Sequence, residues 1–471
     1  MPINSFDAYP LTWKPDKISL TSPYYKSLAA DLEHKIRTGL LKAGTKLPPQ
    51  REIADYLDLN YTTITRAYTV CRQKGLIYGT TGKGTFVSPH AAENVTISSP
   101  PGTYIEMGAI NGFSEYSELV ENATRAVIEK GYLRNLYEYS YPAGHPHQLA
   151  AGSRWLEQLG VHADIEHMTI MSGAQNALTV ALISLFAPGS RIAVDEYTYA
   201  NFIELAKLLH LILVPIEQDE CGMIPQELQK QCRTNNIKGI YLIPSCANPT
   251  AVTIPFERRC ELAAAIRKNN LILIEDDIAS WLSAACGAVL PSLFDLLDRQ
   301  SIYICGMTKS LCPGLRIAYI SFGERFKKAI LHGLINVNIK TSSLDAEIIT
   351  ELILNGDAYK IAARKRQWTK QNCHLYAEYF PMHAGKAVYG KAIEPRYYQW
   401  LPLHGKKSGS EIENELLQRG VRVYHSRRFA AGRNASKNFL RISLCSAKSS
   451  RKLKQGLSIL KDYLLENNLL L

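Results

Sequence analysis

The most constraining feature of this sequence is an alternation that begins at about residue 105. Short apolar runs rich in β-branched residues are separated by segments with helical spacing. Parallel strands need crossover connections, which are usually helices, so this order predicts an α/β fold with a largely parallel sheet wrapped in helices. The predicted strands are Met168–Met171, Ile192–Val194, Leu211–Val214, Ile240–Ile243, Leu271–Ile274, Ile302–Cys305 and Ile317–Ser321.

The first 90 residues have a different pattern, which is compact and mostly helical. Apolar residues one helical turn apart predict a first helix from about Tyr24 to Thr38. A short second helix follows the two prolines at 48 and 49. Asn60 is a good N-cap for a third helix, which carries one apolar stripe. Two β-like runs follow, and Gly82-Lys83-Gly84 between them predicts a hairpin with a cation at its tip.

The segment between these two patterns has the composition of a linker. It contains Ser-Pro-His and then Ile-Ser-Ser-Pro-Pro-Gly. A chain of 471 residues is also too long for one ordinary core. We therefore expect an N-terminal domain at 1–89, a linker at 90–104 and a second domain at 105–471.

Charge and composition narrow the class of protein. The formal net charge is +11, and residues 1–90 carry 12 basic against 7 acidic side chains. This basic end suits contact with a polyanion, although a solvated basic face would give the same count. No apolar run approaches the ~18 residues of a membrane span, and the N-terminus lacks a secretory signal. The ten cysteines form no Cys-x-x-Cys and no His-Glu-x-x-His occurs, so we expect no metal and reduced thiols in the cytoplasm.

The predicted helices and hairpin of the N-terminal domain are the parts of a winged helix-turn-helix. In such a module the third helix lies in the major groove of DNA, the second contacts a phosphate, and the wing reaches the backbone or the minor groove. The alternative is a three-helix packing module with no nucleic-acid role. The DNA-binding residues predicted on this basis are Arg51, Tyr61, Thr62, Thr63, Arg66, Lys83 and Gly84.

The run from Gly39 to Val87 resembles the DNA-binding domain of the GntR regulator family, and the resemblance covers about residues 22–88. It is specific, because prolines, an arginine, threonines and wing glycines stand at set offsets. Asp58 replaces the usual glycine, and aspartate tolerates a left-handed backbone. The resemblance implies that the partner is double-stranded operator DNA.

In the second domain, Lys309 has neighbours that suit covalent chemistry. It follows a predicted strand in the run that starts at Gly306 and ends at Arg316, which places an amine and a guanidinium close together. A lysine that bonds an aldehyde cofactor needs a nearby cation, which binds a phosphate and favours the neutral amine. Between another strand and an apolar helix, backbone N–H groups of Gly173, Ala174 and Gln175 are free to hold a phosphate.

These pieces resemble the pyridoxal-phosphate aminotransferases of fold type I, in the same chain order over some 330 residues. The resemblance implies pyridoxal 5'-phosphate (PLP) bound to Lys309 as a Schiff base. It places Asp276 on the pyridinium nitrogen, where a buried carboxylate would keep the ring protonated as an electron sink. It assigns the ring hydroxyl to Asn248 and ring stacking to Tyr199.

The same resemblance implies further contacts around the cofactor. Arg316 would bind the phosphate, and Tyr139 would reach the phosphate of a neighbouring subunit. Arg441 matches the arginine that grips a substrate carboxylate with a bidentate fork.

Three positions depart from the aminotransferase pattern. Gly306 stands where a serine usually binds the phosphate, Ile278 where a tyrosine bonds the ring oxygen, and Ala251 where a glycine is usual. Each lost hydrogen bond is worth about 1 kcal/mol. Cofactor binding should survive these losses, whereas transamination is affected more because that tyrosine also tunes the reacting centre.

A GntR reader joined to an aminotransferase-like domain is the architecture of the MocR subfamily of bacterial transcription regulators, which this chain resembles over nearly its whole length. Our main hypothesis is a PLP-binding, DNA-binding regulator, a head-to-tail homodimer that responds to an amine, an amino acid or PLP itself. One alternative is a working aminotransferase with an accessory DNA-binding domain. Another is a regulator whose second domain no longer binds the cofactor.

Overall fold

The fold is taken from a computed structural model of the 471-residue chain. It describes residues 11–37, 40–42, 44–80, 82–88, 104–110, 117–283, 289–383, 395–405, 407–432 and 437–470. The chain divides into two compact units, Met1–Thr103 and Tyr104–Leu471. Of the linker expected at 90–104, only residue 104 lies within the described residues. Within the described residues, no helix is long and apolar enough to cross a bilayer.

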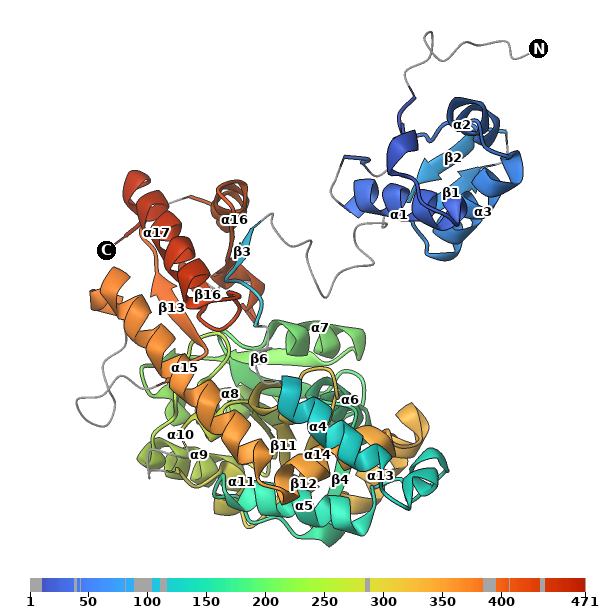
Figure 1. The fold of residues 1–471 in the computed structure, drawn as a ribbon. Coiled ribbons are helices and arrows are strands. Elements are labelled where there is room, and N and C mark those ends of the chain that lie inside the picture. Colours follow the sequence, from blue (N-terminus) through green and yellow to red (C-terminus); the bar gives the residue numbers. More distant parts are fainter. Residues whose placement is uncertain are drawn as a thin grey trace. The chain divides into compact units, whose positions relative to one another are not determined.

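The N-terminal unit has the elements of a winged helix-turn-helix (Figure 1). The Asn60 side chain caps the third helix by accepting from the backbone N–H of Thr62 at 2.9 Å, and Asp58 adopts the expected left-handed conformation with φ 54°. The first helix is confirmed up to its last turn, and Thr38 lies outside the described residues. The elements are η1 (Lys17–Ser19), α1 (Tyr24–Arg37), α2 (Gln50–Leu57), α3 (Tyr61–Gln73), and the antiparallel strands β1 (Ile77–Thr80) and β2 (Gly84–Val87).

The core of this unit forms where the apolar stripes of α1, α2 and α3 meet. Trp13, which precedes the first helix and was not predicted to belong to the core, is 1% exposed. Its indole N–H donates to Asp31 Oδ2 at 2.7 Å, and its ring lies 5.9 Å from that of Tyr68. The segment before α1 is therefore anchored to the unit by a buried aromatic side chain.

The second unit is built on a seven-stranded sheet in the order β4-β12-β11-β10-β9-β5-β6. All seven predicted strands belong to it, and the sheet is largely parallel, because only β12 runs antiparallel to its neighbours. The bounds are β4 (Met168–Met171), β5 (Arg191–Asp195), β6 (Ile212–Ile216), β9 (Ile237–Leu242), β10 (Ile272–Asp277), β11 (Ile302–Gly306) and β12 (Ala318–Phe322).

One predicted boundary is wrong in a way that matters for the site. The sequence places Glu275, Asp276 and Asp277 after a strand, but β10 continues through them, and all three are buried. Two of these carboxylates are satisfied by backbone donors of the following segments. Glu275 accepts from Phe294 N at 2.8 Å, and Asp277 accepts from Ser280 N at 2.8 Å. An apolar pattern alone does not anticipate acidic residues inside a strand.

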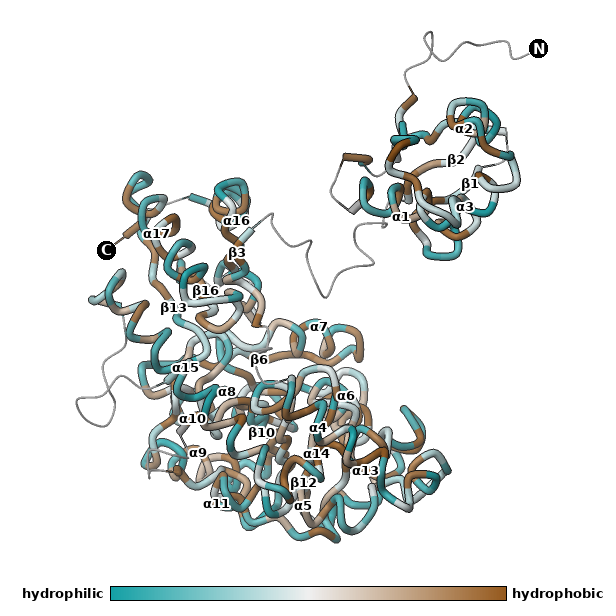
Figure 2. The backbone as a smooth tube through the Cα atoms, in the orientation of Figure 1, coloured by the Kyte–Doolittle hydropathy of each residue, from teal (hydrophilic) through white to brown (hydrophobic). Residues whose placement is uncertain are grey.

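Helices cover both faces of this sheet, as buried parallel strands require. One face packs against α6 (Ala174–Leu185), α7 (Ala200–Leu208) and α13 (Glu324–Asn338), and the other against α5 (Pro146–Glu157), α14 (Ser343–Leu354) and α15 (Asp357–Tyr379). Figure 2 shows that hydrophilic and hydrophobic residues alternate along these helices, as expected for helices with one buried face. The other helices and short strands of this part are α4 (Ser117–Ile128), β7 (Gln218–Asp219), β8 (Gly222–Met223), α8 (Pro225–Thr234), α9 (Phe256–Lys268), α10 (Ser280–Ser283), α11 (Leu293–Leu296) and α12 (Met307–Ser310).

The long helix α15 leads from the large sheet to a smaller part, in which it contacts α17 (Figure 1). A three-stranded sheet here, in the order β13-β16-β15, was not predicted. The first strand of the second unit, β3, also belongs to this part, because it pairs with β14. The bounds are β3 (Ile105–Glu106), β13 (Tyr398–Pro402), α16 (Gly409–Gln418), β14 (Val421–Arg422), β15 (Tyr424–His425), β16 (Phe439–Ser443) and α17 (Ser450–Glu466).

Candidate functional site

The predicted cofactor residues gather at the carboxyl ends of two neighbouring parallel strands. Asp276 lies near the end of β10, and Lys309 lies in the short helix α12 that follows β11. In open α/β sheets, ligands bind in the crevice outside the carboxyl ends of the strands. The topology therefore brings together two residues that are 33 positions apart in the sequence.

The Lys309 amine lies in a buried, electropositive setting. Its Nζ donates to the backbone carbonyl of Ile110. The pKa of Lys309 is lowered to about 8, mainly by burial, and the positive charges of Arg441 and Arg316 act in the same direction. A lysine in this setting is readily deprotonated, which is the state that a nucleophilic amine needs.

Asp276 is a buried carboxylate with one oxygen satisfied. Its Oδ2 accepts from the hydroxyl of Tyr241 at 2.7 Å, whereas its Oδ1 is buried and has no partner among the described residues. Burial raises the pKa of Asp276 to about 7, although the Tyr241 hydrogen bond opposes this. A buried oxygen without a donor is costly, so this geometry favours a cationic or N–H-bearing ligand.

At the start of α6, the backbone at Gly173 has no room for a side chain. Gly173 precedes this helix with φ 85°, and a Cβ there would lie 2.8 Å from an Nη2 atom of Arg316. The guanidinium thus lies close against the backbone at a helix N-terminus, as an anion site requires. Next to it, a Cβ on Gly306 would lie 3.3 Å from that of Ala174, so replacing the usual serine by glycine widens this corner.

Arg441 lies in the small sheet, on β16, and is almost wholly buried. Its Nη1 donates to Asn248 Oδ1 at 2.6 Å and its Nη2 to the carbonyl of Gly108, while its Nε has no partner among the described residues. The guanidinium also lies 4.5 Å from the ring centre of Phe429. Burial lowers the pKa of Arg441 to about 10. Both Nη atoms of this buried guanidinium donate to neutral oxygens, so it has no carboxylate partner among the described residues. A carboxylate ligand would therefore bind it strongly.

The remaining predicted cofactor residues differ in how far their side chains are buried. Burial raises the pKa of the Tyr199 hydroxyl, and the nearby charges of Asp276, Arg441 and Arg316 also influence this pKa. Gln175 has a buried Oε1 without a partner among the described residues. Tyr139 is the exception, because its side chain is 85% exposed.

In the N-terminal unit, six of the seven predicted DNA-binding residues are solvent-exposed, and Thr63 is half-buried. The helix stripe explains this arrangement, because Ile64, Ala67 and Tyr68 of α3 face the core. Arg66 also lies 5.9 Å from the ring centre of Tyr25 at the start of α1. A polar face of α3 is thus exposed to solvent, as are Arg51 of α2 and Lys83 of the wing.

Several residues of the site were missed by the sequence analysis. Tyr241 is hidden in an apolar strand, and Phe429 lies in a short irregular segment. The segment from Gly108 to Ile110 supplies two carbonyls, one to Arg441 and one to Lys309, and has no side-chain pattern that could have revealed it.

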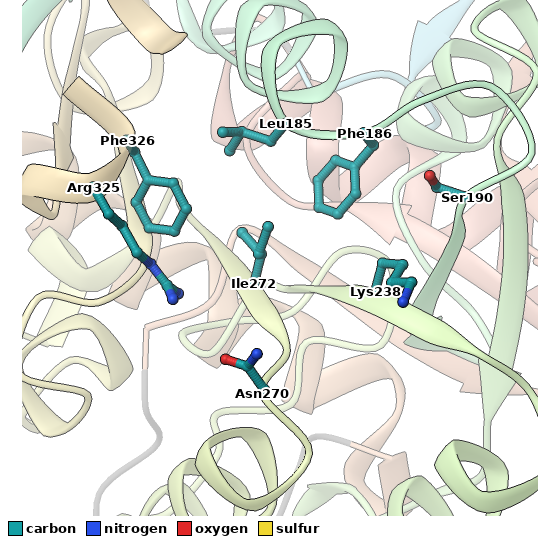
Figure 3. Close-up of a pocket in the computed structure, with 8 residues that line it drawn as sticks. All are labelled: Leu185, Phe186, Ser190, Lys238, Asn270, Ile272, Arg325 and Phe326. Atoms are coloured by element: carbon teal, nitrogen blue, oxygen red, sulfur yellow. The ribbon is translucent and has the colours of Figure 1, made fainter. Parts of the chain in front are cut away.

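A separate hollow of about 340 Å³ lies at the opposite ends of the strands (Figure 3). None of the predicted site residues lines it. It is lined by Leu185, Phe186, Ser190, Lys238, Asn270, Ile272, Arg325 and Phe326.

Comparison with known proteins gives matches for both units. Residues 108–460 match the family "Aminotransferase class I and II", and residues 24–87 match "Bacterial regulatory proteins, gntR family". The HTH-type transcriptional regulator YdeF of Bacillus subtilis is 38% identical over 467 residues, which cover 98% of this chain and 99% of YdeF. YjiR of Escherichia coli, also an HTH-type transcriptional regulator, is 24% identical over 76% of this chain and 82% of its own.

Solved structures match the second unit. An archaeal alanine:glyoxylate aminotransferase has a TM-score of 0.71 and 21% identity, and covers 79% of this chain and 93% of its own. LysN, an α-aminoadipate aminotransferase from Thermus thermophilus, has a TM-score of 0.69 and 22% identity, and covers 77% of this chain and 92% of its own.

The second unit therefore has the fold of the PLP-dependent aminotransferases of fold type I, and this fold and its family imply PLP as the cofactor. The GntR match sets the protein apart from a free-standing enzyme of that class. The chain belongs to the HTH-type transcriptional regulators that join a GntR domain to an aminotransferase class I and II domain, the MocR architecture.

Proposed function

We propose that this protein is a cytoplasmic regulator that binds PLP through Lys309. Its affinity for operator DNA changes when a small ligand binds beside the cofactor. The observation that supports cofactor binding is the buried Asp276 Oδ1, which has no donor among the residues that the structure describes and lies in the same site as a buried lysine. A protonated ring nitrogen would supply that donor and neutralise the carboxylate.

The other predicted residues fit the rest of the cofactor. Gly173, Ala174 and Gln175 would offer backbone N–H groups to the phosphate, and Arg316 its guanidinium. Asn248 would bond the ring hydroxyl and Tyr199 would stack on the ring. When bound, PLP supplies an aldehyde for amines and an electron-withdrawing ring.

Arg441 defines the chemistry of the small ligand. Its fork bonds two neutral oxygens, those of Asn248 and Gly108, in a buried aromatic surrounding. A carboxylate would give it a charged partner, and charge-assisted bonds of this type are roughly twice as strong as neutral ones. An amino acid, with an amine for the aldehyde and a carboxylate for Arg441, therefore fits this site best, ahead of a simple amine or free PLP.

The exposed Tyr139 supports a head-to-tail homodimer. Tyr137, Tyr139 and Tyr141 are all exposed, at 68%, 85% and 73%, which is unusual for three aromatic side chains in five residues. A second copy would cover them and would bring Tyr139 to the phosphate of its partner. Two DNA-binding units would then require an operator with two half-sites.

Trapping tests the cofactor half of this proposal. Full-length protein is incubated with PLP and reduced with borohydride, and the modified peptide is identified by mass spectrometry. We expect one modified lysine, Lys309, and no adduct in Lys309→Ala. Modification spread over exposed lysines, equal in both proteins, would contradict the proposal.

Gel shifts at fixed salt test the DNA half. Arg51→Ala and Arg66→Ala should each weaken binding to a duplex from the region upstream of the gene, and should each reduce the salt slope by about one phosphate contact. Arg72→Ala is the matched control, because Arg72 is exposed on α3 but lies six residues further along and projects from another face. Equal affinity in all three variants would mean that DNA docks elsewhere.

An aminotransferase is the second candidate, because Lys309, Asp276 and Arg441 are all present in the site. Gly306 and Ile278 weigh against it, since each removes a hydrogen-bond donor from this class of site. Turnover of an amino acid with pyruvate or 2-oxoglutarate at ordinary enzyme rates, at least about 1 per second, would favour the enzyme.

A further inference from the structure

A second lysine lies directly behind the site, and the proposed function does not use it. Lys365, on α15, has a relative exposure of 0%. Lysine is almost never fully buried unless it is paired, because an ammonium loses strong hydration in the interior. Among the described residues, Lys365 forms no ion pair with a carboxylate. Something other than a salt bridge must account for a lysine here.

The contacts of Lys365 are backbone carbonyls of the turn that carries Lys309. Its Nζ donates to the carbonyl of Lys309 at 3.3 Å and to that of Leu311. The Tyr397 hydroxyl donates to the same Lys309 carbonyl at 2.7 Å. Helix α12 spans only four residues, so its carbonyls find few donors within the helix. Donors from distant elements therefore fix the turn that holds the reactive amine.

The next residue of α15, Arg366, forms hydrogen bonds to the neighbouring turn. The Arg366 guanidinium donates to the carbonyls of Trp281 and Leu282, the latter at 3.0 Å, in the short helix that follows β10 and Asp276. Two consecutive side chains of one long helix thus hold the segments that follow both cofactor strands. Long aliphatic arms are needed to reach from α15 to these carbonyls, and lysine and arginine provide them.

We propose that Lys365 is a positioning residue for Lys309, which fixes the Lys309 turn from α15 and contributes a positive charge that keeps the Lys309 amine unprotonated. This inference rests on the proposed attachment of PLP to Lys309. Attachment joins the lysine nitrogen to the aldehyde carbon as a double bond, and the aldehyde oxygen leaves as water with the two amine protons. It therefore starts from the uncharged amine, held at a fixed place.

The electrostatic part of the proposal is consistent with the surroundings of both lysines. The pKa of Lys365 is lowered to about 8, mainly by burial, and the charge of Lys309 acts in the same direction. Repulsion between two amines is mutual, so the charge of Lys365 in turn disfavours protonation of Lys309. The influences that oppose these shifts come from cysteines, because Cys445 raises the pKa of both amines and Cys312 raises that of Lys365. The charged or titratable groups that face the two amines are Arg441, Arg316 and Cys445 for Lys309, and Cys312, Cys445 and Lys309 for Lys365.

The test measures attachment rather than activity. Full-length protein freed of cofactor is mixed with PLP between pH 6 and 9, quenched with borohydride at intervals, and the fraction modified at Lys309 is read by mass spectrometry. Lys365→Met keeps an unbranched apolar side chain that ends one atom earlier, and it removes the charge and the donors. We expect attachment at pH 7 to slow about tenfold, with its pH midpoint about one unit higher, because one pKa unit is a tenfold change in free amine. Lys370→Met, an exposed position on the same helix, is the control and should match the wild type.

Two further variants separate charge from geometry. Lys365→Gln keeps one donor without the charge, so it should fold even if Lys365→Met does not, and its pH midpoint should still rise. Tyr397→Phe removes a donor from the Lys309 carbonyl and leaves the charge, so attachment should slow with an unchanged midpoint. A Tyr397→Phe midpoint that moves as far as that of Lys365→Gln would overturn the assignment to charge.

The outcomes distinguish this inference from the proposed function. If the wild type itself is not modified at Lys309, the proposed function fails. If the wild type is modified and the Lys365 variants match it in both rate and pH midpoint, the cofactor site stands and the positioning role of Lys365 is wrong.

Discussion

The two units differ in how far apart along the chain their functional residues lie. The proposed DNA-binding face is formed by residues 51–84, on two helices and a hairpin that follow one another directly. In the second unit, a single arginine bonds a carbonyl 333 positions away. The first surface is thus determined by local pattern and capping, whereas the second exists only once the large sheet, α15 and the small sheet have assembled. This difference predicts that substitutions will affect the two units independently.

The units also differ in how much core supports them. The buried cluster of the N-terminal unit is one small group around α1, α2 and α3, while the second unit has three clusters on both faces of its sheet. Small domains bury a smaller fraction of their surface and are correspondingly marginal. Loss of one large side chain should therefore be more damaging in the N-terminal unit.

Trp13→Ala tests this difference in stability between the two units. Of the substitutions considered, it should have the largest effect. It removes a buried indole and its hydrogen bond to Asp31, at an expected loss of about 4 kcal/mol, close to the whole stability of so small a unit. We expect the N-terminal unit to unfold and DNA binding to disappear, while the main thermal transition of the second unit is unchanged. Calorimetry with a gel shift on the same sample checks both.

The control for this variant is on the same segment. Ile18 is 94% exposed, so Ile18→Ala should change stability by less than about 0.5 kcal/mol. If Trp13→Ala also lowers the transition of the second unit, the two units are not independent and the comparison fails.

Glu347→Ala is the corresponding test in the second unit. The side chain is 0% exposed and accepts from Tyr132 OH at 2.6 Å, Lys130 Nζ at 3.1 Å, His147 Nε2 at 2.7 Å and Gln148 Nε2 at 2.8 Å. Removing it takes one acceptor from the buried Gln148 and the shared partner from three partly exposed donors, so we expect a loss of about 2 kcal/mol. Urea unfolding should show this loss in the second unit alone. Glu121→Ala, which breaks an exposed ion pair, should have almost no effect.

The same carboxylate gives the second unit a pH dependence. Burial raises the pKa of Glu347, but its four donors outweigh burial and bring the pKa to about 2. Since this is below the ordinary value of about 4.5, the stabilisation is complete above pH 4.5 and is lost as the pH falls towards 2. The wild type should therefore lose more stability than Glu347→Ala over this interval. Parallel acid titrations of the two proteins would contradict this assignment.

The comparison also explains what could be predicted from the sequence. Helix stripes, caps and turn glycines are local, so the helices and the hairpin of the winged helix were predicted, whereas the anchor Trp13 was missed. In the second unit, the apolar strands were visible, but a lone Lys365 or Tyr241 carries no pattern that reveals its partner. The positions of Lys309, Asp276 and Arg441 were found by resemblance to a family. Their buried hydrogen bonds could be known only from the assembled fold.

Asp276→Asn should stabilise the folded protein, whereas Trp13→Ala and Glu347→Ala should destabilise it. In the cofactor-free protein, burial raises the pKa of Asp276 from 3.8 to about 7, so the folded state binds a proton that the unfolded state has released. Stability therefore falls as the pH rises from about 4 to 7 and stays lower above that. Asparagine has no charge to bury and still accepts from Tyr241. We expect Asp276→Asn to be about 2 kcal/mol more stable than the wild type at pH 8 and equal to it near pH 4.

Addition of PLP sharpens this prediction. The wild type should gain thermal stability with PLP, because a ligand that binds the folded state stabilises it by mass action. Asp276→Asn should gain less, since the neutral amide does not neutralise the ring nitrogen. A variant that is less stable than the wild type at pH 8 would show that Asp276 serves the fold rather than a ligand.

Asn60→Ala tests the smallest effect, in the unit where local structure predominates. The Asn60 side chain accepts from both the backbone N–H and the hydroxyl of Thr62 at 2.9 Å, which caps α3, the helix proposed to enter DNA. Loss of a cap of this kind is worth about 1 kcal/mol. Asn60→Asp keeps the cap, and its charge suits a helix N-terminus, so it should retain stability. It nevertheless places a negative charge beside the phosphates, so it should bind duplex DNA more weakly than the wild type at low salt and approach it as salt is added. If Asn60→Asp binds as tightly as the wild type at every salt concentration, the N-terminal end of α3 does not face DNA and the docking face must be reassigned.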